Sequence, residues 1–268
     1  GSPNGGVSEV IVTGGAKWIV GDQLVVGNYA SGSLAIENGA TVSSLQGYVG
    51  ASSSGVVTVA GVGSSWGSAT NIVIGNYGVG ALTIAGGAHV RSDVAIGLDS
   101  GASGTLALNG SAAARSVLET GWISAGSGNV DVSIDGGILR ATQSNSDFMT
   151  GFASREITIG ANGAIIDTAG FDIGIAANFG GAGSLRKAGS GTLTITGVNS
   201  YGGHTFVEEG ALVGQVGSIR GNITNAGTVE FNQVTDASFG GSIAGLSGVD
   251  GRMVKSGTGT LTLTGPSS

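Results

Sequence analysis

Residues 82–87 read Leu82-Thr83-Ile84-Ala85-Gly86-Gly87, in which two aliphatic residues alternate with small ones before a pair of glycines. The same pattern returns along the first half of the chain, beginning at Val10, Leu34, Val57, Leu106 and Val132. Counted in chain order, the steps between copies are 24, 23, 25, 24 and 26 residues. One coil of a parallel β-helix needs about this length. The repeat therefore predicts an all-β fold, a right-handed parallel β-helix or β-solenoid.

The composition agrees with a solenoid and excludes several other classes. The 268 residues include 55 glycines but only two prolines, and 10% of them are charged. Glycine suits the many sharp turns of stacked coils, whereas proline removes a hydrogen-bond donor from a central strand. Because the glycines lack a three-residue period and 40% of the residues are hydrophobic, neither collagen nor simple disorder fits. There is no cysteine, so neither disulfides nor thiolate metal sites contribute.

The charge of the chain bears on its partners. The net charge is −7, the isoelectric point is about 4.6 and the ten basic residues are scattered singly. We expect no nucleic-acid partner and no binding to an anionic membrane. No apolar run approaches the length of a membrane helix. Residues 1–6 resemble a tag or linker remnant, so we expect the sequence to be a piece of a longer protein.

A second strand follows the first in each early coil, and its register can be aligned between coils. The third position of this strand is always a β-branched aliphatic residue, which predicts one inward column of Val26, Val49, Ile74, Ile96 and Ile123. The preceding position is variable and is predicted to face outward, as Val25, Tyr48, Val73, Ala95 and Trp122. The first strand predicts two further inward columns, which begin at Val10 and at Val12.

The repeat pattern also predicts the domain organisation. Coils of about 24 residues occupy 7–140. Residues 141–156 break the alternation and are predicted to form an interrupting loop or short helix. The β-helix then continues over 157–268, where a longer repeat covers 185–212 and returns, cut short, at 253–268. Alternation of threonine with Leu or Ile from Thr192 to Thr196 predicts a strand with one buried face and one wet face.

The longer repeat carries a resemblance to a known family. Its core from Lys187 to Gly202 has the form K-x-G-x-G-T-L-T-x-T-G-x-N-x-Y-x-G. This core resembles the passenger-associated repeat of autotransporters, the type V secretion proteins of Gram-negative bacteria. The segment from Gly61 to Ile84 is similar to a coil type of adhesin-like passengers. His204 stands where the family usually has threonine.

The resemblance implies a function and a location. The chain is expected to be an adhesin exported across the outer membrane to the cell surface or extracellular space, serving host attachment, cell–cell aggregation or biofilm formation. Its partner would be a host surface protein or glycan, or the same chain on another cell. Membrane attachment would occur only through a C-terminal β-barrel that is missing from this sequence. Two alternatives stay open: an enzymatic passenger, as a protease or a glycoside hydrolase or lyase, and a passive stalk that carries a distal binding tip.

No residue is predicted to be catalytic, and no metal or cofactor is expected. Asp99-Ser100-Gly101 echoes a protease nucleophile motif but falls where the other coils turn. His89 and His204 are each predicted to be lone surface histidines. The stretch from Gly126 to Asp131 misses the spacing of a calcium repeat. Aspartates in glycine-rich turns are expected to cap their own backbone, at Asp22, Asp167 and Asp172.

Outward aromatic residues are the predicted binding residues. Tyr48 and Trp122 are placed in the outward column, while Tyr29 and Tyr77 follow Gly-Asn at matching turns. Aromatic rings on a solenoid face can stack on sugars or pack against another protein. The alternative is that each ring packs on the neighbouring coil of its own chain. After these four residues, the interrupting segment from Ser144 to Phe152 is the next candidate.

Overall fold

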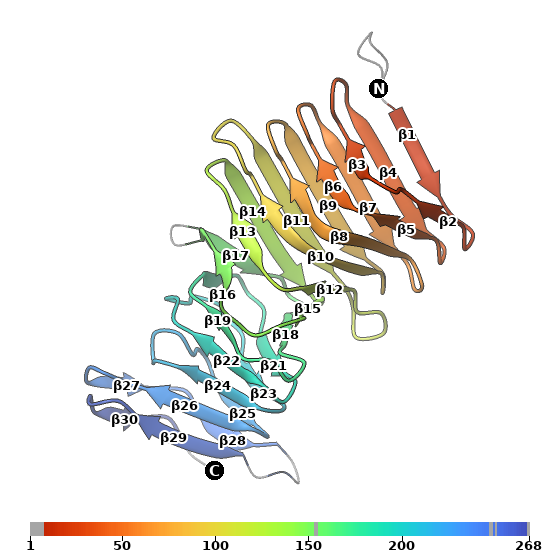
Figure 1. The fold of residues 1–268 in the computed structure, drawn as a ribbon. Coiled ribbons are helices and arrows are strands. Elements are labelled where there is room, and N and C mark those ends of the chain that lie inside the picture. The colour runs from red at the N-terminus through yellow and green to blue at the C-terminus, as the bar shows by residue number, and fades with distance from the viewer. Residues whose placement is uncertain (1–7, 153–154, 247–248, 250, 267–268) are drawn as a thin grey trace. The chain divides into compact units, whose positions relative to one another are not determined.

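The structure is a computed structural model that describes residues 8–152, 155–246, 249 and 251–266. The predicted remnant at residues 1–6 lies outside the described residues. The chain forms two compact units, Gly1–Ile138 and Leu139–Ser268, which we call unit 1 and unit 2. Every regular element of the described residues is a strand, and the strands stack in parallel as a β-solenoid of about 10 turns (Figure 1). The predicted fold class is confirmed.

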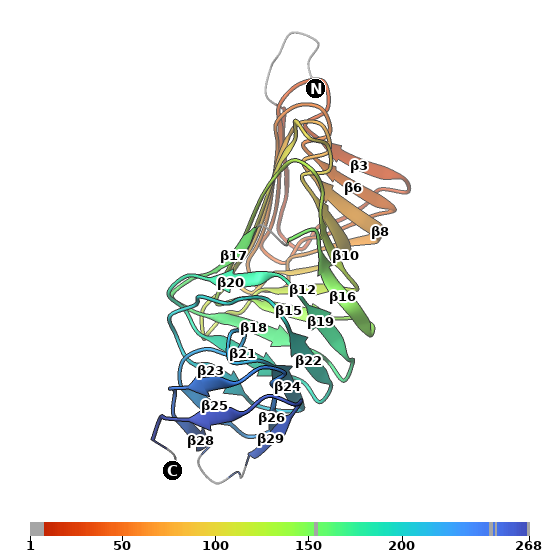
Figure 2. The ribbon, with the colours of Figure 1, turned by 90° about the vertical axis from the view of Figure 1, so that its left-hand side faces the viewer.

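Unit 1 contains three stacks of parallel strands. The first stack holds β1 (Ser8–Val12), β4 (Gly32–Glu37), β7 (Gly55–Ala60), β9 (Val79–Ala85), β11 (Ser103–Asn109) and β14 (Asn129–Asp135). The second holds β2 (Lys17–Ile19), β5 (Thr41–Ser44) and β12 (Val117–Thr120), and the third holds β3 (Gln23–Val26), β6 (Gln46–Val49) and β13 (Ile123–Ala125). The longer strands β8 (Ser65–Ile74) and β10 (His89–Ile96) run through both the second and the third stack (Figure 2).

The predicted inward column of the third stack is correct in four of its five members. Val26 pairs with Val49, Val49 with Ile74, and Ile74 with Ile96. All four are buried. Burying an aliphatic side chain of this size stabilises a fold by roughly 1.5–3 kcal/mol. The column is therefore a major source of stability for unit 1.

The predicted register fails at β13, by two residues. Ile123 is buried but pairs with Val94, and Ala125 takes the place beside Ile96. The cause is a polar interruption, in which the Asp93 carboxylate accepts hydrogen bonds from the backbone N–H groups of Gly121 (2.7 Å) and Trp122 (3.3 Å). These side-chain bonds occupy the two donors that would otherwise have started the strand. Pairing therefore resumes only at Ile123.

The second stack contributes an inward column that the sequence alignment left out. Trp18, Val42, Trp66, Val90 and Leu118 follow one another in register. Trp66 is fully buried, and its indole N–H donates to the Ser44 hydroxyl at 3.2 Å. A Cβ atom added to Gly47 would lie 2.5 Å from the Trp66 ring. Glycine at position 47 therefore makes room for the indole in the core.

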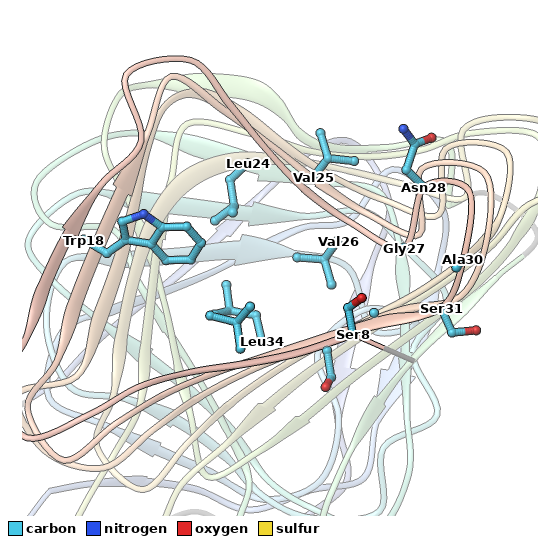
Figure 3. A pocket seen from close by; sticks show the side chains of 13 residues that line it. Ser8, Trp18, Leu24, Val25, Val26, Gly27, Asn28, Ala30, Ser31 and Leu34 are labelled. Carbon is cyan, nitrogen blue, oxygen red and sulfur yellow. The ribbon is translucent and has the colours of Figure 1, made fainter. Parts of the chain in front are cut away.

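The first strand's inward columns are confirmed except at Val10; Val12 of the same coil is buried. Val57, Leu82 and Leu106 are buried, but Val10 is 42% exposed. No described strand lies outside β1, so its apolar residues meet solvent. A shallow hollow of about 120 Å³ opens beside them, and Figure 3 shows Trp18, Leu24 and Leu34 directed into it.

Unit 2 continues the parallel stacking with shorter strands. One stack holds β16 (Asn145–Thr150), β19 (Ile173–Ile175), β22 (Thr192–Ile195), β24 (Ala211–Gly214), β26 (Thr228–Asn232) and β29 (Arg252–Ser256). A second holds β18 (Ala164–Asp167), β21 (Leu185–Ala188), β23 (Thr205–Val207), β25 (Ile223–Asn225) and β28 (Ile243–Gly245). Two further pairs are β17 (Glu156–Ile159) with β20 (Asn178–Gly180), and β27 (Ala237–Phe239) with β30 (Leu261–Leu263). β15 (Ile138–Ala141) lies at the boundary of the units.

The predicted loop or helix over 141–156 is wrong for its central part. Residues 145–150 form β16, which pairs in parallel with β19. Phe148 and Met149 are both buried, so apolar burial holds this segment in the stack although its sequence lacks regular alternation. The pairing contains a bulge, because the five residues of β16 from Asn145 to Met149 match the three residues of β19 from Ile173 to Ile175. The bulge explains why period-two alternation is absent from the sequence.

Candidate functional sites

Two predicted binding residues, Tyr29 and Tyr77, form what we call the tyrosine edge of unit 1. Their side chains are 91% and 66% exposed. Their turns belong to alternate coils, and the turn between them is hydrogen bonded to both, through Ser52 N to Gly27 O and Tyr77 N to Ala51 O. Two steps of strand spacing separate the tyrosines by about 10 Å. The edge thus presents two rings on a hydrogen-bonded support.

A side-chain bond strengthens that support. The Ser52 hydroxyl donates to the backbone oxygen of Asn28 at 2.5 Å and lies 3.0 Å from the Asn28 Oδ1 atom. This contact holds the turn beside Tyr29 against the next coil. Rings held on a fixed backbone lose less conformational freedom when a ligand binds.

The other two predicted residues, Tyr48 and Trp122, do not join this edge. Both are half-buried. The predicted outward column is wrong at Val73 and Ala95, which are only 3% and 5% exposed, and Tyr48 pairs with Val73. The two-residue shift at β13 removes Trp122 from the predicted column with Tyr48, because Ser124 pairs with Ala95. Tyr48 and Trp122 are therefore less accessible to a partner than Tyr29 and Tyr77.

The structure places two of the sequence features that were considered as possible catalytic groups, the Asp99-Ser100-Gly101 stretch and His204. Residues 99–101 form a turn in which the Asp99 carboxylate accepts from Gly101 N. His204 is exposed and lies beside Phe206, with ring centroids 6.2 Å apart. Among the described residues, no group of three or more histidine, cysteine, aspartate or glutamate side chains could hold a metal ion.

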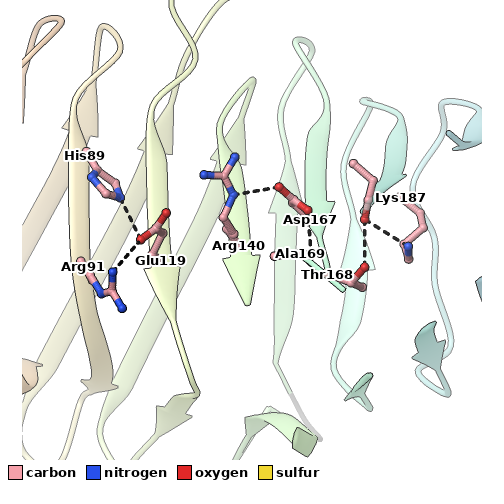
Figure 4. A network of polar contacts seen from close by, with 9 residues as sticks. His89, Arg91, Glu119, Arg140, Asp167, Thr168, Ala169 and Lys187 are labelled. Carbon is pink, nitrogen blue, oxygen red and sulfur yellow. Dashed lines mark hydrogen bonds and ion pairs between the residues drawn. The ribbon is translucent and has the colours of Figure 1, made fainter. Parts of the chain in front are cut away.

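His89 has a neighbour that the sequence analysis did not assign to it. Its Nε2 atom lies 3.4 Å from an oxygen of Glu119, and the Arg91 guanidinium lies 3.7 Å from the same oxygen (Figure 4). Arg91 and Glu119 are direct partners across β10 and β12. The imidazole is 42% exposed, but its Nε2 atom is buried and the Glu119 side chain is only 16% exposed, so the cluster lies partly below the surface.

The lysine of the longer repeat is buried, which is rare for this residue type. Lys187 has no exposed surface, and its ammonium donates to the backbone oxygens of Ala188 (3.1 Å), Gly189 (2.6 Å) and Glu209 (3.0 Å). The first two oxygens belong to its own turn and the third to the next coil. Burial lowers the pKa of Lys187 to about 8. The repeat lysine therefore ties two successive coils together from inside.

Other residues of the repeat core are also used internally. Asn199 accepts from Phe179 N at 2.8 Å and donates to Ser218 O at 2.6 Å. The buried Tyr201 hydroxyl lies 2.7 Å from the Thr205 hydroxyl, and burial raises the pKa of Tyr201. These polar side chains satisfy backbone groups in the interior of unit 2. They are occupied within the fold and do not form a binding face.

The predicted aspartate caps divide into two kinds. Asp167 caps its own turn as predicted, because it accepts from Ala169 N at 2.9 Å, and it also pairs with Arg140 at 2.8 Å (Figure 4). Asp172 instead accepts from Thr192 N, one coil later, at 2.8 Å. This backbone hydrogen bond holds the pKa of Asp172 below its usual value. Asp172 thus links coils, which sequence position alone did not reveal.

Unit 2 contains a groove of about 580 Å³ that the sequence did not predict. One of its walls nevertheless belongs to the segment from Ser144 to Phe152, which was the next candidate for binding after the four aromatic residues. We call this groove the bulge groove. Its walls are residues 144–147 at the β16 bulge, residues 172–176 around β19, and the threonines of β22 and the following residue, Thr192, Thr194 and Thr196. The predicted wet face of β22 is confirmed, because Thr192 and Thr194 alternate with buried Leu193 and Ile195. The groove adjoins the β16 bulge, which the sequence marks only by the missing alternation of this segment.

The chain is therefore a β-solenoid, and its unit 2 contains a repeated turn with buried polar side chains. The model of the passenger-associated-transport-repeat family matches residues 185–213 and 253–268. Together with the β-solenoid, this match fits an autotransporter passenger domain. Passengers with this repeat are secreted to the cell surface or the extracellular space. Comparison with curated proteins and with solved structures gives no match. Among the described residues, none lies in a helix long and apolar enough to span a membrane.

Proposed function

We propose that this passenger is an adhesin and that the tyrosine edge is its contact surface for a host ligand or for the same chain on another cell. The observation that supports this is the exposure of Tyr29 and Tyr77 on stacked, hydrogen-bonded turns. A buried tyrosine would contribute to stability, whereas a ring exposed by nine-tenths contributes little to its own fold. Repeated weak contacts along a solenoid add up when two surfaces meet at several coils.

The experiment compares two double variants of the full-length protein displayed on a non-aggregating bacterium. Replacing Tyr29 and Tyr77 by Ser should weaken cell settling or host-cell binding while leaving the circular dichroism unchanged. The matched control replaces the half-buried Tyr48 and Trp122 by Ser and should leave adhesion per folded molecule unchanged. Full adhesion in the Tyr29/Tyr77 variant would discard this surface. Adhesion that also survives deletion of residues 7–140 would place the binding site outside those coils, in unit 2 or in a distal tip carried by a passive stalk.

An enzymatic passenger is the second candidate, because Asp147 and Asp172 line one groove. Paired carboxylates hydrolyse glycosides when the pKa of one is raised so that it can act as an acid. The pKa of Asp172 is lowered instead, by its bond from Thr192 N. Asp172 is thus not suited to be that acid. Because the sequence offers no catalytic constellation, we expect purified protein to hydrolyse no peptide, ester or glycoside. Turnover that disappears on replacing either aspartate by Asn would assign the protein to the enzyme class.

A further inference from the structure

The bulge groove has the size and the exposure of a ligand site. Its volume of about 580 Å³ falls within the range of roughly 300–1,000 Å³ typical of ligand pockets. Residues 144–147 at the β16 bulge line one side of the groove, and Gly174 of β19 packs closely against them, because a Cβ at this position would lie 2.1 Å from Ser146 O. Phe148 and Met149 of the same strand are buried and hold β16 in the stack.

The lining alternates polar and aliphatic groups at short range. Thr192, Thr194 and Thr196 offer a row of hydroxyl and methyl groups, and Ala176 adds aliphatic surface. Asn145 and Asp147 supply amide and carboxylate groups on the opposite wall. A sugar ring presents the same alternation, with hydroxyl groups at its rim and C–H groups on its faces. Such a surface matches a polyhydroxylated ligand better than a purely apolar one.

The charges of the groove select among such ligands. Asp147 and Asp172 are anionic, and none of the described lining residues is cationic. Sialylated and sulfated sugars would meet like charges that cost binding energy. A metal ion is disfavoured, because no group of three acidic or histidine ligands occurs among the described residues. A carboxylate is a strong hydrogen-bond acceptor for hydroxyl groups.

The carboxylate of Asp147 is available for a ligand. Its backbone N–H donates to the Asn145 side chain, which fixes the position of the residue. Within the described part of the chain, no hydrogen bond or ion pair engages the Asp147 carboxylate itself. The Asp172 carboxylate is oriented by Thr192 N through one oxygen. The groove therefore holds one carboxylate that the fold orients, on Asp172, and one that no bond from the described residues engages, on the exposed Asp147.

We propose that the bulge groove binds a short stretch of a neutral glycan. Its biological use rests on the proposed adhesive function, but the binding site is separate from the tyrosine edge and can be tested alone. Glycan recognition would reside in unit 2, while the contact surface proposed above lies in unit 1.

The test measures binding of the purified 268-residue chain to immobilised neutral oligosaccharides of glucose, galactose, mannose and N-acetylhexosamines. Sialylated and sulfated oligosaccharides and a basic peptide form separate arms. Thr194→Tyr, which fills the groove, should weaken neutral-glycan binding by at least about 10-fold. Thr224→Tyr is the matched control, because Thr224 is a half-buried outward threonine of β25 outside the groove. It should change binding by less than about twofold.

A milder pair keeps the test decisive if a tyrosine disturbs the fold. Asp147→Asn should weaken binding about 10-fold, as expected for loss of a charged hydrogen bond, and Asp131→Asn, at an exposed position of unit 1, should not. Binding of no neutral glycan, preference for the anionic sugars or the basic peptide, or binding unaffected by both groove variants would overturn the proposal. Cell settling of the Tyr29/Tyr77 variant is read separately, so failure of one proposal leaves the other measurable.

Discussion

The two copies of the transport repeat in unit 2 make the same local contacts but differ in burial. Gly189 and Gly257 share a positive φ of 79° and 75°, and Asp172 and Asp236 each accept from the threonine N–H that follows the glycines. The lysines differ, since Lys187 reaches forward to Glu209 in the next coil, whereas Lys255 bonds Ser256 and Gly257 of its own turn and lies 3.5 Å from Gln233 O of the preceding coil. No described strand follows β30. Each copy of the repeat therefore closes its own turn, and the lysine of the first copy is buried because another coil follows it.

The largest expected difference in stability between the copies comes from the glycine at which an added Cβ atom would clash with the backbone of the neighbouring coil. A Cβ atom at Gly191 would lie 1.9 Å from Phe171 O, between coils that are both covered. Gly191→Ala should lower the free energy of unfolding by more than about 3 kcal/mol. At the equivalent Gly259 a Cβ would lie 2.3 Å from the Thr235 backbone, but no described strand follows β30 to hold this turn in place, so Gly259→Ala should cost about 1 kcal/mol. Urea unfolding measures both, and equal losses would contradict the role assigned to the following coil.

Replacing the two lysines should also destabilise the first copy more than the second, but by a smaller difference. Lys187→Met removes the donor shared by three backbone oxygens in the interior, which should cost about 2 kcal/mol. Lys255→Met changes an exposed side chain and should cost less than about 0.5 kcal/mol. Thermal and urea unfolding of the two variants provide the comparison. A Lys187→Met protein as stable as the parent would show that the carbonyls find other partners.

The pH dependence of the free energy of unfolding should reveal the contribution of the buried Lys187. Because its pKa is lowered from 10.5 to about 8, the folded state binds fewer protons than the unfolded state between these values. The free energy of unfolding contributed by Lys187 should therefore rise with pH from about 8 toward 10.5. We expect this rise between pH 7.5 and 9.5 in the parent protein and its absence in Lys187→Met. The same pH profile in both proteins would refute the assignment.

The smallest contrast is expected at the two aspartates, where the copies should agree. Backbone hydrogen bonds from Thr192 and Thr260 hold the pKa of Asp172 and of Asp236 below the usual value. Each carboxylate therefore stabilises the fold above its unfolded pKa, and this contribution is lost as the pH falls through the folded pKa. Carboxyl chemical shifts followed by NMR should give lowered values for both. A normal value at Asp236 alone would mean that the second turn is not closed.

The sequence predicted the solenoid well because its signal is repeated. Each inward column was supported by several copies, so Val26, Val49, Ile74 and Ile96 were aligned correctly. Ile123 was misplaced because the Asp93 carboxylate captures two backbone donors of another coil. Such a contact occurs once and therefore leaves no periodic pattern in the sequence.

The candidate sites were predicted less completely, for the same reason. Exposure of Tyr29 and Tyr77 followed from a repeated Gly-Asn-Tyr turn, whereas Tyr48 and Trp122 depended on how neighbouring outward residues cover them. The bulge groove arises where β16 departs from regular pairing with β19. Alternation identified the threonine wall of β22 but could not place it opposite Asp147.

Hydrogen exchange of backbone amides tests most directly whether the following coil completes the repeat. The measurement compares the amides of Thr192 to Ile195 with those of Thr260 to Leu263 in the 268-residue chain. Strand β22 is paired on both sides, by β19 and β24, whereas among the described strands β30 pairs only with β27. We expect the amides of the first copy to be strongly protected and those of the second copy to exchange at least about 100-fold faster. Equal protection of the two segments would contradict this expectation.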